Sequence, residues 1–133
     1  MPGENGTRRG WRRRWAAVAV AVAPLVLAGC SEKAEPTGAR LAGGDAARGR
    51  RAIERFGCGA CHTIPGIEGA RATIGPSLGD LDKRPQLTGG LENTPENLVR
   101  WVRHPQQVRP GTTMPDLGVG ERDARDIAAY LYR

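Results

Sequence analysis

Apolar residues recur at helical spacing in three stretches of this chain, and each stretch predicts a helix. The stretches cover about residues 45–56, 94–104 and 121–132. Asp45 and Thr94 stand at the starts of the first two, where a side-chain oxygen can cap free backbone N–H groups. We find no stretch that alternates apolar and polar residues as a half-buried strand does. The expected fold class is therefore all-α, with three main helices and long loops.

The first and last predicted helices each have an apolar face and a polar face. In the first helix, Gly49 lies on the apolar face, although glycine inside a helix costs up to about 1 kcal/mol relative to alanine. This predicts that another helix approaches closely at Gly49. In the last helix, the polar face is expected to carry Arg122, Asp126 and Arg133.

Two long loops, residues 63–93 and 106–120, separate the predicted helices, with at most a short helical turn near residues 78–83. Loops this long inside a small domain need something other than secondary structure to order them. The domain expected at residues 44–133 has only four aromatic side chains, so its own core is small. Small domains are marginally stable unless a disulfide, metal or cofactor adds buried contacts, and we expect a cofactor here.

The N-terminal part of the chain has a different pattern. Five arginines precede Trp15, and residues 16–28 are almost all Ala, Val and Leu. A basic segment followed by a short apolar one is typical of a secretory signal peptide, and the apolar run is shorter than the about 20 residues of a membrane-spanning helix. The run ends at Cys30 in the sequence LAGC, which resembles the lipobox of bacterial lipoproteins, where the cysteine carries the lipid.

These features predict three parts: a lipoprotein-type signal peptide at residues 1–29, a flexible tether at residues 30–43 and a folded domain at residues 44–133. The protein is expected on the periplasmic side of a bacterial membrane, held there by a lipid on Cys30. An ordinary cleavage site, which would give a soluble periplasmic protein, and an uncleaved N-terminal anchor stay open as alternatives.

The net charge argues against nucleic acid as a partner. The whole chain has a formal charge of +6, but residues 1–29 account for +4 of it, which leaves +2 from Cys30 onward. A nucleic-acid-binding protein needs a concentrated basic stripe, and the remaining charges are mixed along the sequence.

The candidate chemistry lies in Cys58-Gly59-Ala60-Cys61-His62. Two cysteines at this spacing followed by a histidine are typical of covalent c-type haem attachment, in which each sulfur bonds the porphyrin and the histidine is an axial iron ligand. A thioredoxin-like redox pair would need a βαβ context that the neighbouring sequence does not offer. A structural zinc site would need two further ligands at paired spacing. We therefore predict one covalent haem c on Cys58, Cys61 and His62.

The sixth iron ligand is expected to be Met114. Apart from Met1 it is the chain's only methionine, and it stands in the loop before the last helix. A thioether opposite an imidazole favours the ferrous state, as suits a one-electron carrier. His104 is the rival ligand, an open sixth position is a further alternative, and a structural role for Met114 as an apolar plug also stays open.

Residues 44–133 resemble a class I (mitochondrial-type) c-type cytochrome. The resemblance is carried by Gly44-Asp45 with Gly49, by the Cys58–His62 motif, by Ile74-Gly75-Pro76-Ser77-Leu78, and by Thr113-Met114-Pro115 ahead of a helix with Tyr130. It implies the cytochrome c fold, in which three main helices and long loops surround one covalent haem. One departure is Ile53, where such cytochromes usually have an aromatic residue, and Phe56 is the candidate replacement.

The resemblance also implies roles for individual residues. Pro76 would offer its carbonyl to the other ring nitrogen of His62, and Gly49 would pack against Tyr130 where the first and last helices cross. Trp101 would donate its indole N–H to a haem propionate, although a core position on an apolar face is equally compatible with the sequence.

Residues 93–106 and 114–132 further resemble small membrane-attached cytochromes associated with terminal oxidases. The function this implies is one-electron transfer in a bacterial respiratory chain, from a quinol–cytochrome c reductase-like donor to, or within, a terminal oxidase. The protein is then an electron carrier rather than an enzyme. A peroxidase-like or ligand-binding haem protein with a displaceable sixth ligand, and an assembly subunit of an oxidase, are the alternatives.

Overall fold

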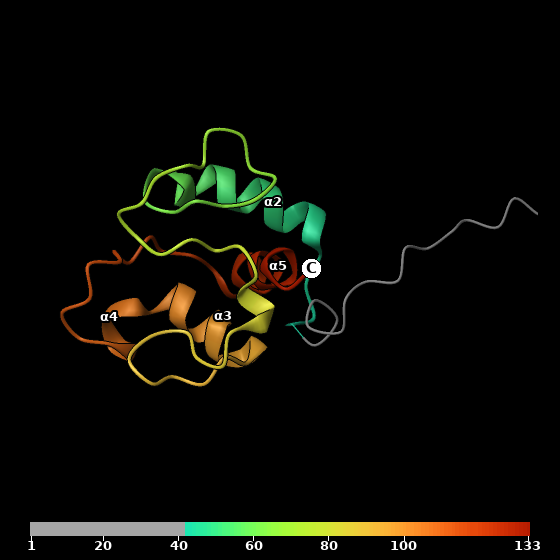
Figure 1. The fold of residues 1–133 in the computed structure, drawn as a ribbon. Coiled ribbons are helices and arrows are strands. Elements are labelled where there is room, and N and C mark those ends of the chain that lie inside the picture. The colour runs from blue at the N-terminus through green and yellow to red at the C-terminus, as the bar shows by residue number, and fades with distance from the viewer. Residues whose placement is uncertain (1–41) are drawn as a thin grey trace, which may run out of the picture. The chain divides into compact units, whose positions relative to one another are not determined.

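The computed structural model describes residues 42–133, which form four α-helices and two single 3₁₀ turns (Figure 1). The helices are α2 (Ala46–Arg55), α3 (Pro95–Arg103), α4 (Pro105–Val108) and α5 (Glu121–Leu131), and the turns are η1 (Cys58–Ala60) and η2 (Leu81–Lys83). Within this part of the chain, extended pairing is limited to the isolated bridges Thr63–Arg71 and Gln86–Glu92. The all-α fold class is confirmed.

The predicted signal peptide, the lipid on Cys30 and most of the predicted tether lie outside the described residues. Ala42, which was assigned to the tether, is 1% exposed, and its carbonyl accepts a hydrogen bond from Arg125. The packed part of the chain therefore includes Ala42, two residues ahead of the predicted domain start. Within residues 42–133, no helix is long and apolar enough to cross a membrane.

Helices α2 and α3 begin where the sequence predicted, directly after the capping residues Asp45 and Thr94. The Asp45 carboxylate accepts the Arg48 N–H at 2.7 Å at the start of α2, and the Thr94 hydroxyl accepts the Asn97 N–H at 3.1 Å at the start of α3. Each bond satisfies a backbone donor that has no partner within its own helix. The short turn expected near residues 78–83 is η2.

Helix α4 was not predicted, because residues 106–120 were expected to be loop. His104 ends α3, and its carbonyl accepts the N–H groups of Gln107 and Val108. Pro105 occupies the first helical position, where its fixed φ suits a helix, and is among the most completely buried residues. Four residues are too few to show a helical period, so the apolar pattern of the sequence could not reveal this helix.

Helix α5 lies between α2 and α3 (Figure 1). The predicted close approach at Gly49 is confirmed: a Cβ there would collide with the Asp126 carbonyl oxygen and lie 3.0 Å from the Tyr130 Cβ. Only glycine allows the backbones of α2 and α5 to come this close. Ile53, one turn further along α2, is buried in the core at 1% exposure, while Phe56 is half-buried against the core.

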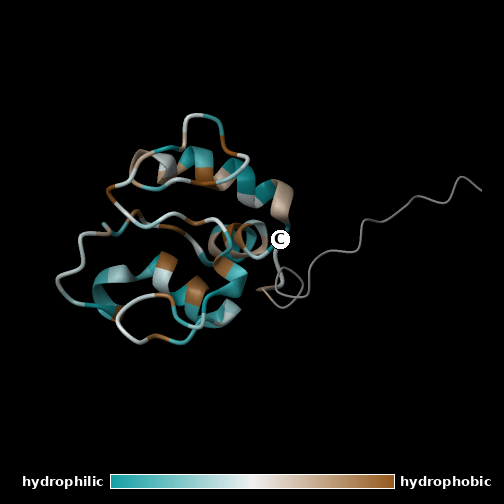
Figure 2. Ribbon diagram, viewed as in Figure 1, coloured by the Kyte–Doolittle hydropathy of each residue, from teal (hydrophilic) through white to brown (hydrophobic). Residues whose placement is uncertain are grey.

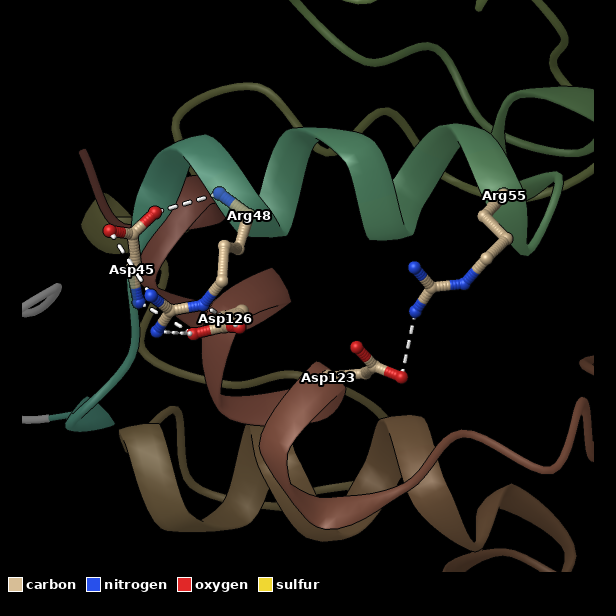
Figure 3. Close-up of polar contacts among 5 residues, drawn as sticks. All are labelled: Asp45, Arg48, Arg55, Asp123 and Asp126. Atoms are coloured by element: carbon tan, nitrogen blue, oxygen red, sulfur yellow. Dashed lines mark hydrogen bonds and ion pairs between the residues drawn. The ribbon is translucent and has the colours of Figure 1, made fainter.

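The position of Asp126 differs from the prediction, which put it on the polar outer face of α5. It is 2% exposed and faces α2 (Figure 3). Its carboxylate accepts hydrogen bonds from the Asp45 N–H at 2.7 Å and from Arg48 Nε and Nη2 at 2.7 and 2.9 Å. A buried carboxylate is tolerated because these donors replace its water.

The core is small. Its largest fully buried side chains are Ile53, Ile64, Ile127 and Pro105, and each helix shows both hydrophobic and hydrophilic residues along its length (Figure 2). Of the larger hydrophobic side chains in the described residues, Ile74 is exposed at 76% and Leu117 at 40%.

Hydrogen bonds to main-chain carbonyls order the long loop between η1 and α3. The Leu78 N–H donates to the Thr63 carbonyl at 2.8 Å. Further along, the Asn93 amide donates to the carbonyls of Leu81 and Arg84 at 2.6 and 2.7 Å, and its oxygen accepts the Tyr132 hydroxyl at 2.6 Å. Asn93 therefore ties this loop to the end of α5.

Candidate functional site

The two cysteines and His62 lie on one tight turn that directly follows α2. Gly57 has φ +68°, a conformation that glycine adopts without strain, and it redirects the chain after the helix ends. The Cys58 carbonyl then accepts the N–H groups of Cys61 at 3.2 Å and His62 at 3.0 Å. Both thiols are free and half-buried. The turn thus brings two thiols and an imidazole together in five residues.

The ring of His62 is oriented from behind by Pro76. His62 Nδ1 lies 2.7 Å from the Pro76 carbonyl oxygen. A carbonyl oxygen only accepts, so this contact places the ring proton on Nδ1 and leaves the lone pair of Nε2 free to bind a metal. Such a contact also fixes the plane of a ligating imidazole and raises its basicity.

Gly75 is a part of the site to which the sequence analysis gave no role of its own. Its N–H donates to the Cys61 carbonyl at 2.8 Å, and a Cβ at this position would lie 2.7 Å from His62 Nδ1 and 3.0 Å from Nε2. Any larger residue would therefore push the imidazole out of place. The signal in the sequence was a glycine next to Pro76.

The environment of the thiols bears on the alternative chemistries. Burial raises the pKa of the Cys58 thiol, whereas a redox-active pair needs a cysteine with a lowered pKa. Within residues 42–133 there is no group of three or more His, Cys, Asp or Glu side chains that could hold a metal ion by themselves. The raised pKa of the Cys58 thiol therefore argues against a thioredoxin-like pair.

Met114 lies on the loop between α4 and α5 and is half-buried. The Gln106 side-chain amide, on α4, donates to the carbonyls of Thr112 at 2.8 Å and Met114 at 2.9 Å. Gln106 was not predicted as a site residue, since no periodicity marks a polar residue in a stretch expected to be loop. Of the other two candidates, Trp101 is half-buried against the core and His104 joins α3 to α4.

Comparison with known protein families matches residues 46–132 to Cytochrome c. The chain belongs to the cytochrome c family. Over 101 residues this cytochrome is 33% identical to cytochrome c2 of Rhodopila globiformis, with 66% of this chain and 92% of that protein covered. The recognition of a class I c-type cytochrome and of its fold is confirmed.

The cytochrome also resembles part of two larger proteins. It is 36% identical over 85 residues to cytochrome c oxidase subunit 2 of Alkalihalophilus pseudofirmus, which covers 63% of this chain and 24% of that subunit. The corresponding subunit of Bacillus sp. strain PS3 is 35% identical over 65 residues, or 47% of this chain and 18% of the subunit. The chain therefore spans at most about a quarter of the oxidase subunits that it matches.

Family membership implies covalently bound haem c as the cofactor. The residues present fit this group. Cys58 and Cys61 offer two free thiols, and His62 presents a free Nε2 beside them. The glycine at position 75 leaves the imidazole the room to keep that orientation.

Proposed function

We propose that this cytochrome carries single electrons in a bacterial respiratory chain, with Cys58 and Cys61 bound to haem and with His62 and Met114 as iron ligands. Membership of the cytochrome c family supports electron transfer as the general function. The observation that carries the assignment of His62 is the 2.7 Å contact between its Nδ1 and the Pro76 carbonyl, which leaves Nε2 available.

Each residue has a distinct task in this mechanism. Cys58 and Cys61 would hold the porphyrin through thioether bonds, and His62 would bind the iron through Nε2. Pro76 keeps the proton on Nδ1 and stabilises the imidazole as a donor. Met114 would supply a soft ligand, which raises the reduction potential relative to that of a site with two imidazoles and excludes peroxide from the iron. Bound haem supplies the exchange of one electron between ferric and ferrous iron.

The electron acceptor in this proposal is a terminal oxidase, and the donor is a quinol–cytochrome c reductase-like complex. Support comes from the two similar proteins that are named cytochrome c oxidase subunit 2. A lipid on Cys30 would hold the cytochrome at the periplasmic side of the membrane, where a short diffusion path serves both partners. The LAGC sequence supports this anchor.

Spectra of the purified holoprotein test the iron ligands. The reduced protein should show a c-type α band. Met114→Ala should abolish the far-red methionine–iron charge-transfer band of the oxidised protein, whereas His104→Ala should keep it. Persistence of the band in Met114→Ala would refute the assignment of Met114. Rapid binding of carbon monoxide or rapid turnover of peroxide by the unaltered protein would favour the ligand-binding or peroxidase alternative.

Membrane fractionation and oxygen uptake test the location and the acceptor. The unaltered protein should sediment with membranes and Cys30→Ala should move to the soluble fraction. Added reduced cytochrome should be oxidised by membranes that contain a terminal oxidase, in a reaction blocked by cyanide. Recovery of Cys30→Ala in the membrane fraction would contradict the lipid anchor, and no oxidation by oxidase-containing membranes would contradict the acceptor.

A further inference from the structure

Residues 112–118, the middle of the loop that carries Met114, are hydrogen-bonded to the rest of the domain through one side-chain amide. The ends of the loop are held separately, by Arg109, which donates to the Thr88 hydroxyl at 3.0 Å, and by the buried Val119. Gln106 Nε2 donates two hydrogen bonds, one to the Thr112 carbonyl at 2.8 Å and one to the Met114 carbonyl at 2.9 Å. Within residues 42–133, the other hydrogen bonds of residues 112–118 stay inside residues 109–118. Figure 1 shows this segment as a long loop without a helix between α4 and α5.

Gln106 is suited to hold this loop because its own position is rigid. It follows Pro105, whose side chain is fully buried and anchors α4 in the core. The backbone on both sides of Pro105 is held as well, since the His104 N–H donates to the Arg100 carbonyl at 3.0 Å and the Arg109 N–H donates to the Pro105 carbonyl at 2.9 Å. The hydrogen bonds from Gln106 therefore fix the position of the loop relative to α3 and the core.

The two acceptors lie immediately around the candidate iron ligand. Pro115 follows Met114 and restricts it to extended backbone conformations. The Gln106 amide then holds the Met114 carbonyl itself, so both the conformation and the position of this residue are constrained. Its neutral amide uses both donors on one nitrogen, which a carboxylate of the same shape cannot do.

We propose that Gln106 is a positioning residue for Met114: its amide clamps the Met114 backbone so that the thioether stays within reach of the iron. The inference rests on the proposed function, in which Met114 is the iron ligand. Without the clamp the loop moves more freely, Met114 leaves the iron more often, and an external ligand enters faster.

The neighbouring Gln107 provides a matched control. It has the same side chain on the same four-residue helix and is exposed, but within the described residues its side chain makes no hydrogen bond to the Met114 loop. Gln106→Glu keeps the shape and removes both donors, and Gln106→Leu removes all polarity. Because Gln106 is itself exposed, both variants are expected to fold.

The experiment measures the rate at which imidazole replaces the internal ligand in the oxidised holoprotein, followed by loss of the far-red band. Because Gln106→Glu and Gln106→Leu each lose both hydrogen bonds, the rate should rise roughly tenfold in each, which corresponds to about 1.4 kcal/mol. Gln107→Leu should keep the original rate. Rates within twofold of the unaltered protein in both Gln106 variants would overturn the proposal.

Two further measurements separate this role from general destabilisation and from failure of the ligand assignment. Asp126→Asn should lower the midpoint of unfolding without changing the imidazole rate, whereas a tenfold increase there would refute a specific role for Gln106. Met114→Ala should lack the far-red band. If Met114→Ala keeps the far-red band, Met114 is not the iron ligand, and the positioning role of Gln106 is refuted as well. If Met114→Ala loses the band but the Gln106 variants exchange imidazole at the original rate, only the positioning role of Gln106 is refuted.

Discussion

The interface of α2 and α5 contains two ion pairs in different environments, which allows a controlled test of how this fold is held (Figure 3). Asp126 is 2% exposed and is paired with Arg48 at 2.7 Å. Asp123, one helical turn earlier, is paired with Arg55 at 2.7 Å, but its side chain is 36% exposed. The change we consider is aspartate to asparagine at each position, which removes the charge and keeps the shape.

In Asp126→Asn, one side-chain nitrogen would replace an oxygen that now accepts from Arg48, so a donor would face a donor. Hydrogen bonds to charged groups contribute about 1.5–3 kcal/mol, and we expect a loss of about 2 kcal/mol in the free energy of unfolding. For a domain of this size that corresponds to a midpoint lowered by roughly 10 °C. Asp123→Asn should cost less than about 1 kcal/mol, as is usual for exposed ion pairs.

The pH dependence gives a second, independent signature. Burial alone would raise the pKa of Asp126, but the bonds from Arg48 and Asp45, together with the charge of Arg48, hold this pKa below its usual value. The carboxylate therefore stabilises the fold above the unfolded pKa of about 3.9, and this contribution is lost as pH falls through the lower folded value. The difference between the unaltered protein and Asp126→Asn should shrink accordingly below about pH 4.

The assay is denaturant unfolding of the oxidised holoprotein, followed by far-ultraviolet circular dichroism at pH 7 and at several values below pH 4. Equal losses in Asp126→Asn and Asp123→Asn would refute the argument from burial. A difference that does not change with pH would refute the argument from the lowered pKa of Asp126.

Three further predictions concern other contacts. Gly49→Ala should lower the free energy of unfolding by about 2 kcal/mol in a denaturant titration, because its Cβ would collide with the α5 backbone. The control is Gly120→Ala, since position 120 has open space and an ordinary φ. An equal loss in the control would contradict the close approach at Gly49. Gly75→Ala should displace the His62 ring and shift the reduction potential in a spectroelectrochemical titration, so an unchanged potential would count against this contact. Burial raises the pKa of Tyr132 to about 12, so its neutral form stabilises the fold below pH 10 and this stability is lost between pH 10 and 12. Tyr132→Phe should therefore lose that part of the alkaline pH dependence of the free energy of unfolding. An unchanged pH dependence in Tyr132→Phe would argue against the raised pKa.

The helices with local start signals could be predicted from the sequence. Asp45 and Thr94 cap their helices through side-chain oxygens only three residues from the N–H groups they accept. Such contacts depend on nearby residues alone and leave a readable pattern. Helix α4 has no comparable pattern, because its four residues are too few to show a helical period, although Pro105 at its start is fully buried.

Polar residues that serve long-range contacts could not be assigned in the same way. Asp126 occupies a position that helical periodicity places among polar residues, yet its partners Asp45 and Arg48 bury it. Asn93 and Gln106 lie in or beside loops and bind main-chain carbonyls, which every residue possesses. No pattern of side chains indicates which carbonyl a loop residue will reach, so these contacts require the structure.

The two sides of the candidate haem site are supported very differently, and this difference bears on function. The His62 turn continues directly from α2, and Pro76 and Gly75 hold it from behind through bonds of 2.7 and 2.8 Å. The neighbouring Pro65 carbonyl accepts the Tyr130 hydroxyl of α5 at 2.8 Å, so the main helix interface also supports this side.

On the Met114 side, residues 112–118 are hydrogen-bonded to the rest of the described domain through one exposed glutamine, Gln106. Local opening is cheapest where few buried contacts and few hydrogen bonds must be broken. If Met114 and His62 bind the iron as proposed, an external ligand should therefore displace Met114 and leave His62 bound. Such a carrier would keep its haem attached each time the Met114 loop opens. The frequency of that opening would determine how readily external ligands reach the iron.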